Sequence, residues 1–383
     1  MPRLLEVPVQ VWARDPNRVR KGQLTPLSAQ CVLRESGVGT WSITVDESSQ
    51  WPPVVQEGWG VVVMDGGTTV FSGPVTEIQV DQNGTERDVT LSGVTDMHVL
   101  ADRLVYPNPA QGFNAQTISH YKAKGAAETL ILDLIRGQCT PDEAWPTRVR
   151  RTPGLTLPVS LGRGTTTSVE ARFTRLLDEV QALATVGGLV VDIVQDGTDL
   201  PLVFREPRDK SRSVRFMQDS GLGAYTVKNT APTITTVILG AQGEGASRTI
   251  TGKSAPNETR WGARRIEQFS DRRDTEDADE HQKTMTEVLA EGGPSGSATF
   301  EVAETNDLRY GAHFQLGDVV SVVLPGGNTI TDGVRYVEIT WDPYGREVKL
   351  TVGDESTDEP LAPKELQALK TLQRNVRGLA VRR

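Results

Sequence analysis

Two stretches of this 383-residue chain, about 260 residues apart, carry variations of one β-structure pattern. The first covers residues 58–91 and the second covers residues 316–351. Each has a β-branched run, a Gly-Gly turn, a strand that opens with Gly and carries Glu-Ile, a polar turn with Gly, and an alternating strand with Leu near its end. The duplication predicts two related small β-barrels. Three such chains in a ring would present six similar barrels, so that a threefold object could meet a sixfold tube.

Composition also favours turn-rich β-structure. Aromatic residues make up only 5% of the chain, whereas Gly is present 37 times and Pro 22 times, which is untypical of long helical bundles. A chain of this length is expected to form two to four domains of roughly 100–200 residues each. The expected fold class is therefore mainly β with α+β insertions.

Several protein classes are disfavoured by the same overview. No apolar run approaches the roughly 18 residues of a membrane span, and the N-terminus lacks a signal-peptide core, so we expect no membrane span and synthesis in the cytoplasm. Cys31 and Cys139 lie far apart and predict buried thiols, not a disulfide framework or metal site. The net charge of -9 argues against a general nucleic-acid binder, although it would suit an acidic lumen past which nucleic acid slides.

The chain divides into four expected regions. These are a first β-barrel domain, a mixed α/β middle region, the strands of a second β-barrel domain, and a linker with a C-terminal interaction helix. Their expected bounds, in that order, are 1–97, 98–297, 298–353 and 354–383. Within the middle region, apolar periodicity predicts helices near 126–136, 169–186 and 272–291.

Local signals refine the middle region. Thr167 or Ser168 can cap the second predicted helix, and Gly187-Gly188 can end it. A hairpin is then expected from residues 189–194 and 202–205, around Asp196-Gly197. A further strand is expected at 233–239.

The C-terminal helix is expected from Pro363 to about Arg377. Its apolar residues follow steps of three, three and four, which place them on one stripe with Lys and Arg on the other faces. A helix this short needs a partner surface to be stable. The stripe is the candidate interaction site, either with another subunit or partner or with its own chain, and consists of Leu366, Leu369, Leu372 and Val376.

Two glycine-rich segments resemble phosphate-binding loops, but the resemblance is superficial. Residues 240–245 and 252–254 are both followed by strand-like or loop-like sequence, not by the helix whose N-terminus would hold phosphate. Residues 240–245 are better explained as a β-turn or bulge. We therefore expect no nucleotide and no other cofactor.

No motif points clearly to catalysis or metal binding. The four histidines, His98, His120, His281 and His313, lie in four different segments without metal-ligand spacing. The acidic run 271–277 could in principle supply a carboxylate pair for glycoside hydrolysis, but a solvated helix start explains it more simply. We expect no catalytic, cofactor-binding or metal-binding residues and no enzymatic activity.

Two further groups of residues have an alternative interpretation. The arginines Arg148, Arg150, Arg151 and Arg163 predict an exposed loop, with contact to a partner carboxylate or nucleic acid as the alternative. The tryptophans of the first β-region favour core and rim packing over a sugar platform. They are Trp41, Trp51 and Trp59.

Several of these segments together resemble the minor tail protein family of actinobacterial siphophages, the Gp37-like group. The most specific pieces are Gly-Ala-Gln-Gly-Glu-Gly at 240–245 and Leu-Gly-Asp-Val at 316–319. The group is itself similar to baseplate hubs of contractile tails and to spike bases of type VI secretion. The resemblance spans most of residues 5–353 and also includes 71–75, 91–94, 183–188 and 265–271.

The resemblance implies a structural virion protein, a tail-tip or baseplate hub. Such hubs are homotrimers whose paired barrels form a pseudo-sixfold ring that closes the tail tube and anchors fibre or spike proteins for host attachment and DNA passage. Expected partners are copies of the chain, the distal tail protein or tail tube ring, the tape-measure protein, and tail fibre or central spike proteins, with transient passage of viral DNA. The protein would be assembled in the host cytoplasm and reside at the virion tail tip. A receptor- or glycan-binding tail module is the alternative, and a cell-wall hydrolase is less favoured.

Overall fold

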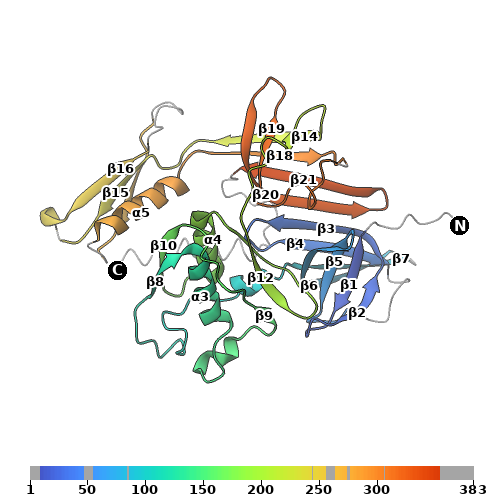
Figure 1. Cartoon of the computed structure of the whole chain (residues 1–383), viewed down its shortest axis with the longest axis horizontal. Coiled ribbons are helices and arrows are strands. Elements are labelled where there is room, and N and C mark those ends of the chain that lie inside the picture. Colours follow the sequence, from blue (N-terminus) through green and yellow to red (C-terminus); the bar gives the residue numbers. More distant parts are fainter. Residues whose placement is uncertain are drawn as a thin grey trace. The chain divides into compact units, whose positions relative to one another are not determined.

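The computed structural model describes residues 9–46, 55–83, 86–243, 245–255, 264–273, 277–305 and 307–353 (Figure 1). Of these described residues, 47% lie in strands and 16% in helices, so the protein is mainly β, as predicted. The chain forms two compact units, residues 1–225 with 299–352 and residues 226–298 with 353–383. No helix among the described residues has the length and apolar character needed to cross a membrane.

Thirteen of the described strands form one large sheet. Its path runs β14-β18-β21-β20-β3-β4-β7-β6-β5-β1-β2, with β19 pairing both β20 and β13. The earlier strands are β1 (Gln10–Arg14), β2 (Arg20–Leu24), β3 (Pro26–Arg34), β4 (Thr40–Asp46), β5 (Gly60–Asp65), β6 (Thr68–Asn83) and β7 (Glu86–Val94). The later strands are β13 (Arg215–Phe216), β14 (Leu222–Thr230), β18 (Ser295–Val302), β19 (Val319–Val323), β20 (Thr329–Asp342) and β21 (Gly345–Gly353).

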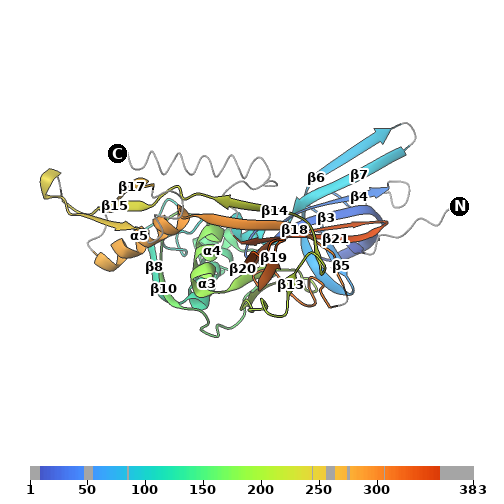
Figure 2. The same cartoon turned by 90° about the horizontal axis from the view of Figure 1, so that it is seen from above.

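The two sequence-related stretches fold in the same way. In each, a long strand pairs first with the strand before it and then with the strand that follows, and the second pairing has a bulge near its start. β6 changes from β5 to β7 with an irregularity between Val75 and Glu77. β20 changes from β19 to β21 with an irregularity between Val334 and Tyr336. The second half of β6 and β7 form a long hairpin (Figure 2).

The backbone hydrogen bonds around each switch repeat as well. Val75 N donates to Trp59 O at 2.9 Å, and Val334 N donates to Asp318 O at 3.0 Å. The residue before each acceptor is a glycine in the left-handed region, with φ of 80° at position 58 and 81° at position 317, a conformation that most other residues avoid. The duplication is therefore present in the backbone and not only in residue types.

The repeat extends to the strands that precede these stretches. Ser92 Oγ donates to Ser42 Oγ across β7 and β4 at 3.2 Å. At the counterpart position, Thr299 and Thr351 join their hydroxyls across β18 and β21 at 3.0 Å. The repeated unit therefore has five strands, which are β3, β4, β5, β6 and β7 in one copy and β14, β18, β19, β20 and β21 in the other.

The two repeats share one sheet instead of forming separate barrels. β3 pairs antiparallel with β20, from Arg34 opposite Tyr336 to Ala29 opposite Trp341. This pairing continues the second half of β20 into the first repeat. Among the described strands the expected small barrels do not close on themselves, because this edge is used to join the repeats.

A helical subdomain of the first unit lies between the repeats. Its helices α3 (Ala127–Cys139) and α4 (Leu176–Gly187) lie side by side (Figure 1). The helices pack around a core that includes Leu130, Ile131 and Val180. The remaining elements are α2 (His98–Ala101), β8 (Tyr121–Ala126), the 3-10 helix η1 (Pro146–Arg150), β9 (Leu155–Thr156), β10 (Thr166–Ala171), β11 (Val190–Ile193) and β12 (Leu200–Arg205).

The prediction of a helix over 169–186 is wrong at its start. Residues 166–171 form β10, which pairs antiparallel with β8 along its whole length. Val169 and Ala171 are buried on one face of this strand, and Phe173 then takes a positive φ of 51° that ends the extended run. Neither Thr167 nor Ser168 caps α4, which begins after Arg175 without a side-chain cap. The predicted hairpin is confirmed as β11 and β12.

The described part of the second unit contains a small sheet and the helix α5. Strand β15 (Thr236–Gly240) pairs antiparallel with β16 (Ile250–Ser254) and parallel with β17 (Glu267–Asp271). Helix α5 (Ala278–Glu291) packs on this sheet through Met285 against Val237 and Leu239. A short 3-10 helix, η2 (Gly245–Ser247), lies between β15 and β16.

Candidate functional site

The Leu-Gly-Asp-Val segment holds a buried carboxylate. Asp318 is only 2% exposed and accepts hydrogen bonds from Arg205 Nη1 at 2.8 Å, Arg208 N at 3.0 Å and Gln315 N at 3.0 Å. Ionised acceptors make hydrogen bonds of this kind strong. Asp318 therefore ties the start of β19 to the segment that follows β12, which gives this motif a structural role.

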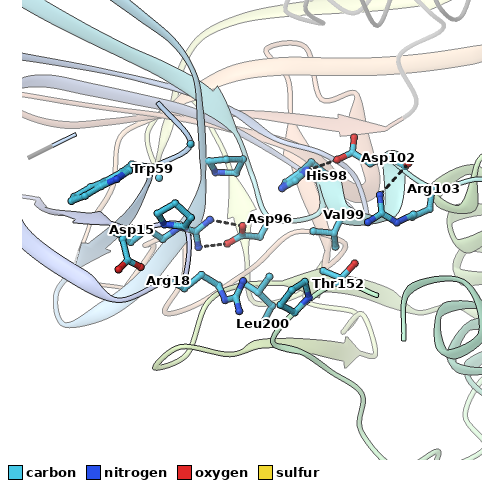
Figure 3. Close-up of a pocket in the computed structure, with 16 residues that line it drawn as sticks. Asp15, Arg18, Trp59, Asp96, His98, Val99, Asp102, Arg103, Thr152 and Leu200 are labelled. Atoms are coloured by element: carbon cyan, nitrogen blue, oxygen red, sulfur yellow. Dashed lines mark hydrogen bonds and ion pairs between the residues drawn. The ribbon is translucent and has the colours of Figure 1, made fainter. Parts of the chain in front are cut away.

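A cavity of about 240 Å³ lies within the first unit, beside a buried ion pair (Figure 3). Arg14 donates to both carboxylate oxygens of Asp96, at 2.8 and 2.6 Å. Arg14 also donates to Gln195 Oε1 at 2.6 Å, and Ser72 Oγ donates to Asp96 at 2.6 Å. The network joins β1, β6 and the segment after β11, so that it connects the first repeat to the helical subdomain.

The other carboxylates around this cavity also have basic side chains as partners. His98 Nδ1 lies 2.7 Å from Asp102 and holds the pKa of that carboxyl below its usual value. Lys21 lies 3.0 Å from Asp15 and likewise lowers its pKa. A general acid needs a raised pKa near the working pH. These groups are therefore suited to holding structure, not to donating protons.

A second cavity of about 500 Å³ in the same unit is lined by several arginines. Asp65 lies 3.5 Å from Arg309 and 3.4 Å from Arg346. Asp192 also lines this cavity, and desolvation raises the pKa of its carboxyl to about 6, while the charge of Arg205 opposes the shift. Part of the Asp192 residue is nevertheless exposed. A glycosidase needs two free carboxylates of unlike pKa, whereas Asp65 is held by arginines.

The glycine-rich segment after β15 does not form a phosphate cradle. The side chain of Arg248 binds the backbone carbonyls of this segment, with Nε donating to Ala241 O at 3.0 Å and Nη2 donating to Gly240 O at 2.8 Å. A strand, β16, follows the segment, and the Gly-Lys-Ser triplet lies within that strand. The carbonyls of this loop therefore accept a cation, whereas a phosphate loop presents amide donors.

The acidic run 271–277 is only in part a helix start, because Asp271 ends strand β17 and the helix predicted from residue 272 begins at residue 278. Asp277 caps the helix, since its carboxylate accepts from Asp279 N at 2.8 Å. Asp271 pairs with Arg248 at 2.5 Å. Residues 274–276 lie outside the described residues. Within the described part of the chain, no three His, Cys, Asp or Glu side chains gather into a metal-binding group.

Three of the four arginines singled out in the sequence have partners inside the chain, namely Arg150, Arg151 and Arg163, whereas Arg148 is exposed. Arg150 lies over the ring of Tyr106, 3.7 Å from its centroid, and donates to Gln138 Oε1 at 2.8 Å. Arg163 donates to the fully buried Glu128 at 2.8 Å. These intramolecular contacts account for Arg150 and Arg163 without an external acid.

The tryptophans are not gathered into a platform in the described residues. Trp41 is buried and stacks on Phe71, with ring centroids 6.1 Å apart. Trp59 lines the smaller cavity, and Trp51 lies outside the described residues. The predicted interaction stripe also lies outside the described residues, so it stays a prediction: Leu366, Leu369, Leu372 and Val376.

The fold and these motifs agree with a known family. The profile of the family described as Siphovirus ReqiPepy6 Gp37-like protein matches residues 8–354. The chain belongs to this family. No curated protein matches the sequence.

Solved structures share the fold of this Gp37-like protein at low sequence identity. The 43 kDa tail protein of prophage MuSo2 from Shewanella oneidensis is 11% identical with a TM-score of 0.58, covering 90% of this chain and 97% of its own. A tail protein from Neisseria meningitidis is 14% identical with a TM-score of 0.56, covering 91% and 97%. Prophage tail protein gp18 from Listeria monocytogenes is 12% identical with a TM-score of 0.54, covering 91% and 95%. The Gp37-like protein is thus a structural protein of the phage-tail type.

Proposed function

We propose that this Gp37-like protein is the tail-tip hub, a homotrimer whose six repeats form a pseudo-sixfold ring that closes the tail tube. The observation that carries the proposal is the five-strand repeat, with its matching bulges, positive-φ glycines and cross-strand hydroxyl pairs. Two equivalent units on one chain let a threefold assembly present six equivalent positions to a sixfold tube.

The remaining parts of the chain then serve attachment. The helical subdomain and the second unit would dock the fibre or central spike proteins, while the ring contacts the distal tail protein or tail tube and the tape-measure protein. Viral DNA would cross the ring during ejection. Assembly in the host cytoplasm precedes incorporation into the virion.

The proposed role is non-enzymatic. It is supported by the pairing of Asp96 and Asp318 with arginines and of Asp102 with a histidine, because a hydrolase needs carboxylates that remain free to exchange protons. An assay of purified cell wall tests this part directly. Release of sugar or peptide that disappears on changing one carboxylate would overturn it.

The mass of the purified protein tests the trimer. Multi-angle light scattering should give about 125 kDa, three times the chain mass of 41.7 kDa. The measurement should be repeated over a wide concentration range and with the distal tail protein added. A mass of one chain under all these conditions would contradict the proposal.

A further inference from the structure

The junction between the two repeats of one chain suggests how neighbouring chains join. Within the chain, β3 is the first strand of the first repeat and pairs with residues 336–341 of β20 in the second repeat. The strand corresponding to β3 in the second repeat is β14. The residues corresponding to 336–341 in the first repeat are 77–82 of β6.

Both of these corresponding edges are open among the described strands. β14 ends the strand order of the sheet and pairs with β18 alone. The 75–83 half of β6 pairs with β7, and its other edge has no partner strand in the described chain. An open strand edge presents unpaired N–H and C=O groups, which favour pairing with another strand.

Side-chain burial differs between the β3–β20 junction within one chain and the two open edges. On β20, Ile339 is 0% exposed, whereas its counterpart on β6, Val80, is 45% exposed. On β3, Ala29 is 1% exposed, whereas its counterpart on β14, Ala224, is exposed. At these two pairs of positions, the residue is buried where the neighbouring strand is present and exposed where it is missing.

We infer that β14 of one copy pairs antiparallel with the 77–82 half of β6 of the next copy, in the manner of β3 and β20. The occupant of each open edge is thus a second copy of this chain, because the two halves of the junction are both present on every chain. This head-to-tail contact closes into a ring when the rotation fits. The count of three copies rests on the proposed function.

The repeat also fixes the register of the pairing. A Cβ at Gly223 would lie 3.0 Å from Glu301 Cβ, so these residues lie opposite each other across β14 and β18. The hydroxyl pairs make Glu301 the counterpart of Thr44, which lies opposite Ser28. Gly223 therefore corresponds to Ser28.

Two residues further along, Tyr225 corresponds to Gln30. Gln30 lies opposite Thr340 across β3 and β20, and Thr340 corresponds to Asp81 on β6. Tyr225 of one copy is therefore opposite Asp81 of the next. Both side chains are exposed, Tyr225 at 44%, so cysteines at these positions should leave the fold intact.

Disulfide cross-linking tests the register. Directly opposite residues of antiparallel strands have Cα atoms about 4.5–5.5 Å apart, within the roughly 4.4–6.8 Å of natural disulfides. Mild oxidation of the full-length Tyr225→Cys/Asp81→Cys variant should give covalent dimers and trimers on a non-reducing gel, reversed by dithiothreitol. The parent chain should give none, because Cys31 and Cys139 are buried.

Two matched variants serve as controls. Tyr225→Cys/Glu77→Cys places the second thiol about 13 Å further along β6 and should cross-link at least tenfold less. Gln30→Cys/Thr340→Cys should form a disulfide within one chain. This positive control shows that the oxidant can link cysteines placed opposite each other across two paired strands of this sheet.

The possible outcomes separate this inference from the proposed function. A threefold mass without a Tyr225–Asp81 link, or with equal linking at both β6 positions, would overturn the strand pairing while leaving the hub intact. A mass of one chain at high concentration, again without the link, would overturn both. A trimer linked only in the predicted register is the result that the repeat requires.

Discussion

The buried ion pair between Arg14 and Asp96 gives the sharpest prediction on stability. Their side chains are only 6% and 2% exposed, and the pair connects the first repeat to Gln195 beyond β11. Arg14→Met would leave the Asp96 carboxylate buried without its cation, which costs about 3–5 kcal/mol. At roughly 2 °C per kcal/mol for a unit of this size, the Tm should fall by about 6–10 °C.

Differential scanning calorimetry of the isolated chain measures this change. Arg14→Met/Asp96→Asn should be less damaging than Arg14→Met alone, since no unpaired charge is left behind. Arg151→Met is the matched surface control, because the Arg151 and Glu143 side chains are 51% and 73% exposed and such pairs contribute about 0–1 kcal/mol. A loss below about 1 kcal/mol for Arg14→Met, or a double variant as damaged as the sum of its parts, would refute the reasoning.

Three further predictions address other parts of the chain. The buried Glu128 has a pKa held below its usual 4.5, first by the hydrogen bond from an arginine, so its stabilisation is present above that pH and is lost as the pH falls through the lowered pKa. Glu128→Gln should therefore lower the Tm at pH 7 and flatten its fall in acid, and a curve parallel to that of the parent chain would contradict this. Burial raises the pKa of Cys139 to about 12 and that of Cys31 as well, so neither thiol should react with a disulfide reagent at pH 8 until urea unfolds the chain, and fast reaction in the native protein would count against their burial. Leu366→Glu and Leu372→Glu should each impair assembly with partners while leaving the Tm of the isolated chain within about 1 °C, whereas a polar change on another face of the predicted helix should not.

The duplication could be found in the sequence because it depends on local backbone demands. The glycines at positions 58 and 317 both have positive φ, so few other residues could replace them. The finer alignment was wrong, however. In the sequence, the Glu-Ile pair at 77–78 aligns with the Glu-Ile pair at 338–339. The strand registers, however, place Ile78 opposite Leu91 and Val337 opposite Leu350. The structural counterpart of Glu77 is therefore Tyr336. Alternating strands look alike after such a slip.

Features that depend on contacts between distant parts of the chain could not be predicted from the sequence. Residues 169–171 were predicted as the start of a helix, but they belong to β10, which pairs with β8 about 45 residues earlier, and tertiary pairing overrides local propensity. Arg14 and Asp96 are 82 positions apart and carry no motif. The pairing of β3 with β20 joins an N-terminal strand to a C-terminal strand. The apolar periodicity of either strand does not identify its partner.

Rotational symmetry of the purified assembly tests the central claim most directly. Electron-microscope class averages, viewed along the ring axis, should show threefold symmetry with six similar densities around a central opening, because each chain supplies two copies of the five-strand repeat. A closed particle of another symmetry, or single chains that stay separate when the tail partners are added, would contradict the account.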